Sequence, residues 1–273
     1  MYKMNPVTKK VALFTNARDE KHIKEWAAHH LLIGIDYIFI FDHKSKVPII
    51  NIFKNFDKRV VIQNVSHLNS GIKMNLMNYA ASIAKKINVD WMIYLDADEF
   101  LILNDRFRGV KHFLNHYNHA DSLGVNWLMF GSNNLVSDPD GLILENYTKS
   151  SLLLDQHVKS FVRPKEIVNS INPHFYNIKQ RARMFGINNR VITGLPAFNK
   201  HNIPYNESTA YIAHYVNQSE ETFIKRKSLL PRDDNGEMRL NLNVNKIHSE
   251  FNDHENLQPK MKYAANVKQF LVE

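Results

Sequence analysis

The sequence contains no cysteine among its 273 residues. A disulfide scaffold, a thiol nucleophile and any zinc or iron–sulfur site with cysteine ligands are therefore excluded. No apolar run approaches the roughly 18 residues that a membrane-spanning helix needs. The segment Met1–Lys10 is polar and contains Pro6, so it lacks the apolar core of a signal peptide. These absences predict a protein without a membrane span that acts in the cytoplasm, in a bacterium or in a virus-infected cell.

Phosphate-binding fingerprints are also missing from the sequence. Neither a Walker loop nor a glycine-rich dinucleotide-binding motif occurs, which removes the main support for a kinase or a dehydrogenase. Lys and Arg exceed Asp and Glu by 35 to 27, which gives a formal charge of +8. The basic residues are scattered and form no arginine-rich arm, so we expect no nucleic-acid partner. Most of the charge should face solvent, and part of it can serve an anionic substrate.

Strand and helix signals alternate in the first half of the chain. Two segments with helical periodicity, Ile23–Leu31 and Ile72–Ile87, separate short apolar runs that are typical of buried strands. These runs are Val11–Thr15, Tyr37–Phe41, Val60–Ile62 and Trp91–Leu95. Successive β-α-β units with short connections predict an α/β fold with a mostly parallel central sheet and helices on both faces.

The second half is less regular. Strands are expected at Ser122–Phe130, Phe161–Pro164 and Ala210–Val216, and helices around Glu220–Leu230 and Pro259–Leu271. No internal repeat and no long linker interrupts the pattern, so we expect one compact domain.

The strongest chemical signal is Asp96-Ala97-Asp98, directly after the apolar run Trp91–Leu95. Residues i and i+2 of an extended segment point the same way, and two carboxylates so aligned repel unless a cation or a proton intervenes. A divalent ion such as Mn²⁺ or Mg²⁺ is the natural partner, and it can bridge phosphate oxygens. The alternative is a solvated acidic turn. Polar residues at 16–20 and Asp42 also follow strand ends, where ligands bind in parallel sheets.

At this point the sequence resembles glycosyltransferases of the GT-A fold, and more narrowly the family 2-like and family 92-like enzymes. The DxD at residues 96–98 resembles their metal motif. Further matching segments follow in order over residues 10 to 230: NARDE at 16–20, FDHKS at 41–45, WMIYLDADEFL at 91–101, NWLMFGS at 126–132, KSFVRP at 159–164 and AHY at 213–215.

The resemblance implies a Rossmann-like GT-A domain with three parts. Residues 1–105 would form the nucleotide-binding half, residues 106–230 the donor-sugar and acceptor half, and residues 231–273 a C-terminal extension. It also implies transfer of a sugar, with inversion, from a nucleotide sugar such as a UDP-sugar to a hydroxyl of a glycan, a protein or a small molecule.

The resemblance further assigns roles to individual residues. Asp98 and the later His214 would bind the metal, and Asp96 would contact the ribose or the metal shell. Contacts to the nucleotide would come from Thr15, Asn16, Glu20, Asp42, Lys225 and Arg226. The family's arginine position reads Met74-Asn75 here, so its contact to the diphosphate is missing and Lys73 is the candidate substitute. Structural readings stand beside these roles: Glu20 can cap a helix, and Lys225 and Arg226 can lie on a solvated helix face.

The general base of an inverting transferase is not fixed by any matched segment. Asp138 and Asp140 are the favoured candidates, with Asp155 and Glu166 as further ones. For Trp127 and Phe130, a place in the core and stacking beside a sugar both remain open. Two other classes of function stay possible at this point: a metal-dependent hydrolase of nucleotide sugars or phosphodiesters, and a basic nucleic-acid-binding protein.

Overall fold

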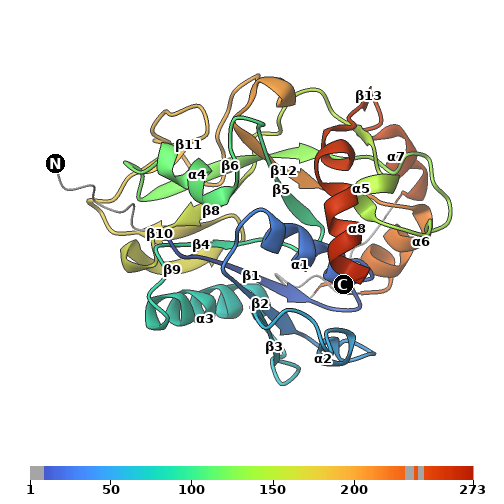
Figure 1. Cartoon of the computed structure of the whole chain (residues 1–273), viewed down its shortest axis with the longest axis horizontal. Coiled ribbons are helices and arrows are strands. Elements are labelled where there is room, and N and C mark those ends of the chain that lie inside the picture. The colour runs from blue at the N-terminus through green and yellow to red at the C-terminus, as the bar shows by residue number, and fades with distance from the viewer. Residues whose placement is uncertain (1–8, 231–236, 239–242, 273) are drawn as a thin grey trace.

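The computed structural model describes residues 9–230, 237–238 and 243–272. Its centre is a nine-stranded sheet in which eight strands follow the order β3-β2-β1-β4-β8-β6-β12-β5 and β11 pairs with β6 (Figure 1). The strands are β1 (Val11–Ala17), β2 (Tyr37–Asp42), β3 (Val60–Asn64), β4 (Trp91–Tyr94), β5 (Glu99–Leu103), β6 (Ser122–Met129), β8 (Val158–Val162), β11 (Met184–Gly186) and β12 (Ala210–His214).

Most neighbouring strands of this sheet run parallel. The pairs β3/β2, β2/β1, β1/β4, β6/β12 and β6/β11 are parallel. Strand β8 is antiparallel to both β4 and β6, and β5 is antiparallel to β12. The expected α/β class with a mostly parallel sheet is therefore confirmed. Because β8 is reversed, its first residues lie at the same edge as the last residues of β4 and β6.

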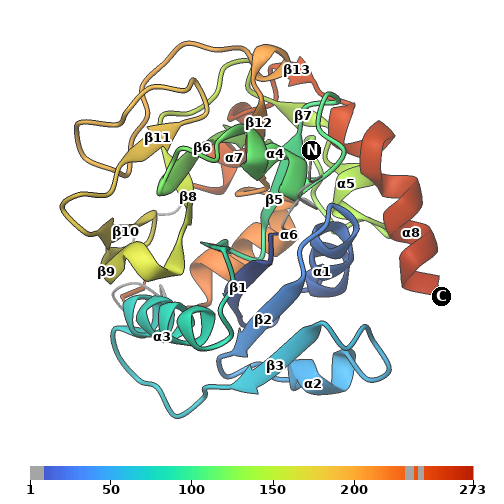
Figure 2. The same cartoon turned by 60° about the vertical axis from the view of Figure 1, so that its left-hand side comes forward.

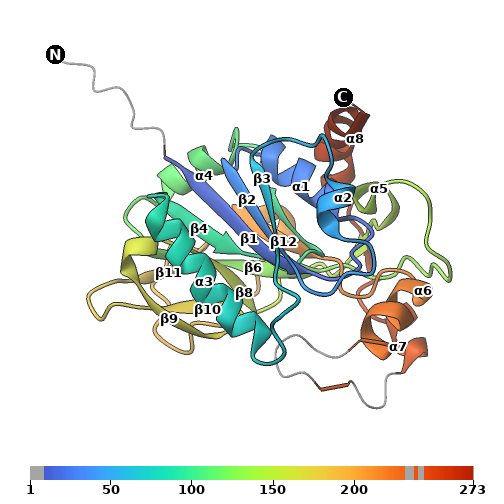
Figure 3. The ribbon, with the colours of Figure 1, turned by 90° about the horizontal axis from the view of Figure 1, so that it is seen from below.

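Helices cover both faces of the sheet, as expected. Helices α1 (Ile23–Leu32), α4 (Val110–His116) and α8 (Ala265–Val272) pack on one face, and α3 (Ile72–Lys86) packs on the other (Figure 3). Strand β1 shows why two cores form. Val11 and Leu13 belong to the cluster under α1, whereas Ala12 and Phe14 belong to the cluster under α3. Successive side chains of a strand point to opposite faces, so an all-apolar strand feeds both cores.

Short elements connect and extend this frame. Figure 2 shows the hairpin of β9 (Ile167–Asn172) and β10 (Phe175–Ile178) beside α3, and a second small pair forms between β7 (Lys149–Ser150) and β13 (His254–Glu255). The remaining helices are α2 (Ile49–Ile52), α5 (Ile143–Asn146), α6 (Glu220–Phe223) and α7 (Val244–Ser249). Short 3₁₀ helices span Pro164–Glu166 and Tyr205–Glu207, and π-helical turns span Ile224–Ser228 and Lys260–Ala264.

The elements expected in the first half match the structure to within a few residues. Three were not predicted: the short helix α2, and β5 and α4, whose short apolar runs follow the acidic motif without clear periodicity. The helix expected at Glu220–Leu230 is α6 continued by a π-helical turn, and the strand expected at Phe161–Pro164 begins earlier, at Val158. The three-part division of the domain stays a prediction, and residues 231–236, 239–242 and 273 of its C-terminal extension lie outside the described residues.

Among the residues described, none of the helices combines the length and apolar character needed to cross a bilayer.

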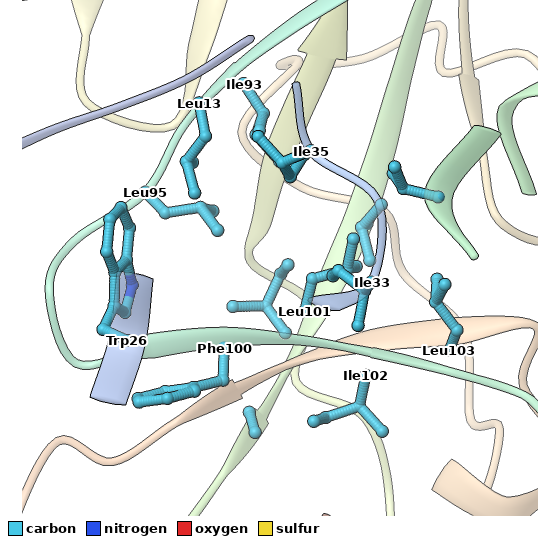
Figure 4. Packing of buried hydrophobic residues seen from close by; sticks show 14 of the residues in the cluster. Leu13, Trp26, Ile33, Ile35, Ile93, Leu95, Phe100, Leu101, Ile102 and Leu103 are labelled. Carbon is cyan, nitrogen blue, oxygen red and sulfur yellow. The ribbon is translucent and has the colours of Figure 1, made fainter. Parts of the chain in front are cut away.

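The core under α1 is anchored by Trp26. Its side chain is fully buried, and its indole Nε1 donates a hydrogen bond to the backbone carbonyl of Glu99 at 2.8 Å. Figure 4 shows Trp26 among apolar residues that include Leu13, Leu95 and Phe100. Trp26 therefore links helix α1 to the start of β5, immediately after the acidic motif.

We expect Trp26→Ala to lower the free energy of unfolding by about 3–5 kcal/mol, because it opens a cavity and leaves the Glu99 carbonyl without its donor. Urea denaturation followed by circular dichroism measures this. The control is Leu32→Ala on the same helix, where the side chain is 43% exposed and the change should stay within about 0.5 kcal/mol. Equal losses in the two variants would contradict the role given to Trp26.

Candidate active site

The Asp96-Ala97-Asp98 motif forms a tight turn between β4 and β5. The amide of Glu99 donates to the Asp96 carbonyl at 3.1 Å, and the Glu99 carboxylate accepts from the Asp96 amide at 2.9 Å. The expectation of an extended segment is therefore wrong. The chain must leave β4 and enter β5, a strand at the far edge of the sheet, so it turns at this point. The two carboxylates consequently have different partners.

Asp96 is neutralised by two lysines from separate elements. Lys73 of α3 forms an ion pair with Oδ1, and Lys159 of β8 donates to Oδ2 at 3.1 Å. Both lysine side chains are buried, whereas the Asp96 carboxylate is 35% exposed. Burial disfavours the charged form of Asp96, but the fields of Lys159 and Lys73 outweigh burial and hold its pKa well below the usual range. Asp96 is thus an anion that faces partly outward.

Asp98 lies deeper and contacts two other predicted residues. Its Oδ2 accepts a hydrogen bond from Arg226 Nη2 at 3.0 Å, and its Oδ1 lies 3.8 Å from Nε2 of His214. The same Arg226 nitrogen reaches Oε1 of Glu20 at 3.1 Å. Although burial opposes the charge on Arg226, the carboxylates of Glu20 and Asp98 raise its pKa. The structure therefore brings Glu20, Asp98, His214 and Arg226 together from four segments of the chain.

Backbone pairing fixes this arrangement. His214, the last residue of β12, is in register with Glu99, the first residue of β5. The amide of Tyr215 donates to the Asp98 carbonyl, and the amide of Phe130 donates to the His214 carbonyl, both at 3.0 Å. Arg226 follows α6, which lies beyond the carboxyl end of β1 (Figure 3). The site therefore occupies the carboxyl edge of the sheet, as expected for an α/β fold.

Three residues expected to contact the nucleotide are engaged in local structure. Thr15 is fully buried at the end of β1, and Asn16 accepts a hydrogen bond from the Tyr94 hydroxyl at 3.0 Å. The two oxygens of Asp42 accept the amides of Ser45 at 3.2 Å and Ile49 at 2.8 Å. Asp42 thus stabilises the loop that leads into α2, and nucleotide contacts by these three residues stay predictions.

The remaining candidates lie around α6. Lys225 is exposed and pairs with Glu221 at 2.5 Å, which matches the solvated helix face weighed as its alternative. Asp138 accepts hydrogen bonds from the hydroxyls of Ser219 and Thr222. Burial would raise the pKa of Asp138, but these two hydrogen bonds outweigh burial and lower it. Asp140 lies exposed in the same loop.

Two of the residues predicted to bind a divalent ion, Asp98 and His214, lie together. Across residues 9–230, 237–238 and 243–272, no group of three or more His, Asp and Glu side chains is arranged to hold a metal. The Asp98 carboxylate and the His214 imidazole nevertheless face one another. Carboxylate oxygens suit Mg²⁺ and Mn²⁺, whereas an imidazole nitrogen is a poorer ligand for Mg²⁺. The pair would supply two protein ligands to an ion, and other oxygens would have to complete the shell.

Lys159 lies at this edge without a role predicted from the sequence, and Trp127 lies there with two roles left open. Lys159 is buried. A lysine within the otherwise mainly apolar segment Val158–Val162 was the feature of the sequence that could have indicated a buried ion pair. The ring of Trp127, on β6, lies 4.4 Å from the ring of His214 and 5.2 Å from the ring of His157. Phe130 is fully buried, which confirms a place in the core. Trp127 is only partly buried and adjoins the site.

Glu99 makes the stability of the fold depend on pH in a predictable direction. It is fully buried, and burial raises its pKa to about 8, opposed by Lys159 and reinforced by Asp96 and Asp98. The unfolded chain loses this proton near the ordinary value of 4.5, whereas the folded protein keeps it up to about pH 8. Glu99 therefore contributes less stability as the pH rises between these values.

We expect Glu99→Gln to remove this pH dependence. The unfolding free energy of the wild type, taken relative to the variant, should fall by at least about 1 kcal/mol between about pH 5 and pH 8. Urea denaturation at each pH measures it, with the exposed Glu207→Gln as the control. Parallel pH curves for the wild type and Glu99→Gln would contradict the raised pKa.

Comparisons with solved structures give partial overlaps only. They include HddC from Yersinia pseudotuberculosis, with 11% identity over 65% of this chain and 89% of that chain at a TM-score of 0.39. They also include S. aureus TarS 1-349 in complex with UDP-GlcNAc, with 14% identity over 57% of this chain and 45% of that chain at a TM-score of 0.34. Such scores are too low to carry an argument about the site.

Comparisons of sequence are decisive for the family. A glycosyltransferase family 92 protein of Ricinus communis is 28% identical over 155 residues, which is 55% of this chain and 27% of that protein. The chain thus spans about a quarter of the length of this curated relative. The profile of glycosyltransferase family 92 matches residues 12–263, nearly the whole chain. The resemblance to GT-A glycosyltransferases is confirmed in its narrower form: the chain belongs to glycosyltransferase family 92.

Proposed function

We propose that this protein transfers a sugar from a UDP-sugar to a hydroxyl group of an acceptor, with inversion at the anomeric carbon and with the help of a divalent metal ion. The carrying observation is the cluster of Asp98, His214, Arg226 and Glu20 at the carboxyl edge of the sheet. Membership of a glycosyltransferase family gives the reaction class, and the cluster supplies the chemistry that such a reaction needs.

The cationic groups of this site would receive the leaving diphosphate. Lys73, Lys159 and Arg226 place three cationic groups around the acidic turn, and all three side chains are at least four-fifths buried. Charge-assisted hydrogen bonds from such groups are stronger than those at an exposed surface. Fixed cations that already face the developing charge lower the barrier without reorganising during the reaction.

Asp98 and His214 would hold the metal ion. When bound, the ion neutralises the charge that develops on the leaving diphosphate. Asp96, which is held ionised and partly exposed, would contact the ribose or the metal shell, and Glu20 would orient Arg226. The roles of Thr15, Asn16, Asp42 and Lys225 in nucleotide binding, and the cytoplasmic location, stay predictions.

We expect Asp98→Asn to abolish nucleotide release from UDP-sugars in the presence of Mn²⁺. The variant keeps the shape of the side chain but loses the charge that attracts the ion, so the rate should fall by about 100-fold or more. His214→Ala should weaken the apparent affinity for Mn²⁺ more modestly, because one ligand of the shell remains. The assay measures UDP release over a panel of UDP-glucose, UDP-galactose and UDP-N-acetylglucosamine, with UDP binding followed by calorimetry.

The matched control is Asp105→Asn, whose carboxylate is 84% exposed and paired with Lys262, and which should retain the wild-type rate. Wild-type turnover in Asp98→Asn would disprove the role of Asp98. If the wild type neither binds UDP nor releases it from any donor, the proposed function is wrong. Release of free sugar that no added acceptor changes would indicate a hydrolase instead.

A further inference from the structure

A histidine–carboxylate pair lies at the start of β8, outside the cluster described above. The Nδ1 atom of His157 lies 2.6 Å from Oδ1 of Asp155, and the same oxygen accepts the His157 amide at 2.8 Å. The side chains are 34% and 35% exposed, so solvent and ligands reach both. The backbone and the imidazole of His157 are thus both held by one carboxylate.

This pairing leaves the other ring nitrogen of His157, Nε2, able to accept a proton. When Nδ1 donates its proton to the Asp155 carboxylate, Nε2 carries the free lone pair of the neutral imidazole. Within the described part of the chain, Nε2 of His157 has no hydrogen-bond partner. A carboxylate that fixes the tautomer of a histidine and stabilises the imidazolium is the arrangement that activates hydroxyl groups in hydrolases.

The pair adjoins the proposed donor site through Trp127. The indole of Trp127 stacks on the His157 ring, with centroids 5.2 Å apart and planes inclined by 27°. The ring of His214 lies 4.4 Å from the same indole between ring centroids, and His214 in turn faces Asp98. The Trp127 ring therefore contacts both His157 and a proposed metal ligand.

The geometry of an inverting transfer sets where the base must lie. The base must approach the acceptor on the side of the sugar opposite the departing diphosphate, so it should not be one of the groups that bind the diphosphate. The antiparallel run of β8 places His157 at the same edge of the sheet as Trp127 and Asp96. Its ion pair is with Asp155, not with the carboxylates that hold Lys73, Lys159 and Arg226.

His174 and Phe198 pack against the ring of His157, and Asp155 is its anionic partner. His174, whose ring lies 5.3 Å away, has its pKa lowered to about 4 by burial and by Lys159, so it adds no positive charge near neutral pH. Lys159 directs its charge to Asp96. Phe198 packs on the ring at 4.8 Å, and Asp155 is the anion in direct contact with the ring.

Asp138, one of the two favoured sequence candidates, is less suited to this task. Asp138 already accepts hydrogen bonds from two hydroxyl groups, and its lowered pKa makes it a weak base. Its contacts with Ser219 and Thr222 hold the start of α6, which is a structural role.

We propose that His157 is the general base for the acceptor hydroxyl and that Asp155 is its positioning residue, an inference that rests on the proposed function. As the acceptor oxygen forms its bond to the anomeric carbon, Nε2 of His157 takes the hydroxyl proton. The bond from that carbon to the diphosphate oxygen breaks, and UDP leaves with the electron pair. The imidazolium, stabilised by Asp155, then returns its proton to solvent.

The test compares the wild-type chain with His157→Ala, His157→Gln and Asp155→Asn. The donors are the three UDP-sugars named above, with Mn²⁺, and the acceptors are the methyl β-glycosides of glucose, galactose and N-acetylglucosamine. Reactions without a glycoside measure transfer to water. Both His157 variants should lose at least about 100-fold in kcat, whereas their affinity for UDP should stay within about twofold. Asp155→Asn should lose at least about tenfold in kcat, again without loss of UDP affinity.

Two controls separate chemistry from structure. His119→Ala changes an exposed histidine near the opposite end of β6, and it should retain wild-type kcat. Imidazole added to the buffer should restore part of the turnover of His157→Ala, which has space for it, and none of that of His157→Gln. If His157→Ala does not fold, as judged by circular dichroism, His157→Gln provides the same test with a side chain that fills the site but is not basic.

The outcomes distinguish the two proposals. A kcat within about threefold of the wild type in either folded His157 variant overturns the assignment of the base and leaves the proposed function intact. A parallel loss of UDP affinity and kcat also overturns it, because it indicates a binding or structural role. Absence of UDP binding and release in the wild type overturns the proposed function itself, and the base assignment with it.

Discussion

The structure depends on a balance of charge at the carboxyl edge of the sheet. Asp98 and Glu99 are buried there beside the partly exposed Asp96, and like charges at such distances repel strongly in a medium of low dielectric constant. Three cationic side chains, from α3, from β8 and from the turn after α6, offset this repulsion, and Glu99 offsets more of it by keeping its proton. Removal of one partner would leave a buried charge uncompensated, so these groups act as a unit.

The same balance explains how a fold made mainly for packing can support a reaction. Trp26 holds α1 to the beginning of β5, and the pairing of β5 with β12 sets His214 opposite Glu99. The acidic turn is therefore held both by the apolar core under α1 and by the ion pairs of its carboxylates. Rigid support of this kind is what electrostatic stabilisation of a leaving group requires, because the groups need not move as charge develops.

Family membership and site geometry tell different things about this protein. The match over residues 12–263 assigns the chain to glycosyltransferase family 92, and it does so without any knowledge of the side-chain arrangement. The arrangement, in turn, sets the Asp155–His157 pair against Trp127 and gives it ion-pair partners different from those of Asp96 and Asp98. The proposed departure of a diphosphate and the proposed activation of a hydroxyl would thus use different groups.

The sequence by itself determined most of the elements of the first half, the α/β class and the position of the acidic motif. It could do so because apolar periodicity and strand-end polarity are local properties, as the runs Val11–Thr15 and Trp91–Leu95 show. Only the tertiary structure decided which charges meet. The turn at residues 96–99 follows from the distant place of β5 in the sheet, and the contacts of Arg226 with Glu20 and of Lys159 with Asp96 join residues far apart in the chain. Spacing along a sequence does not encode such pairings, because strand order sets them.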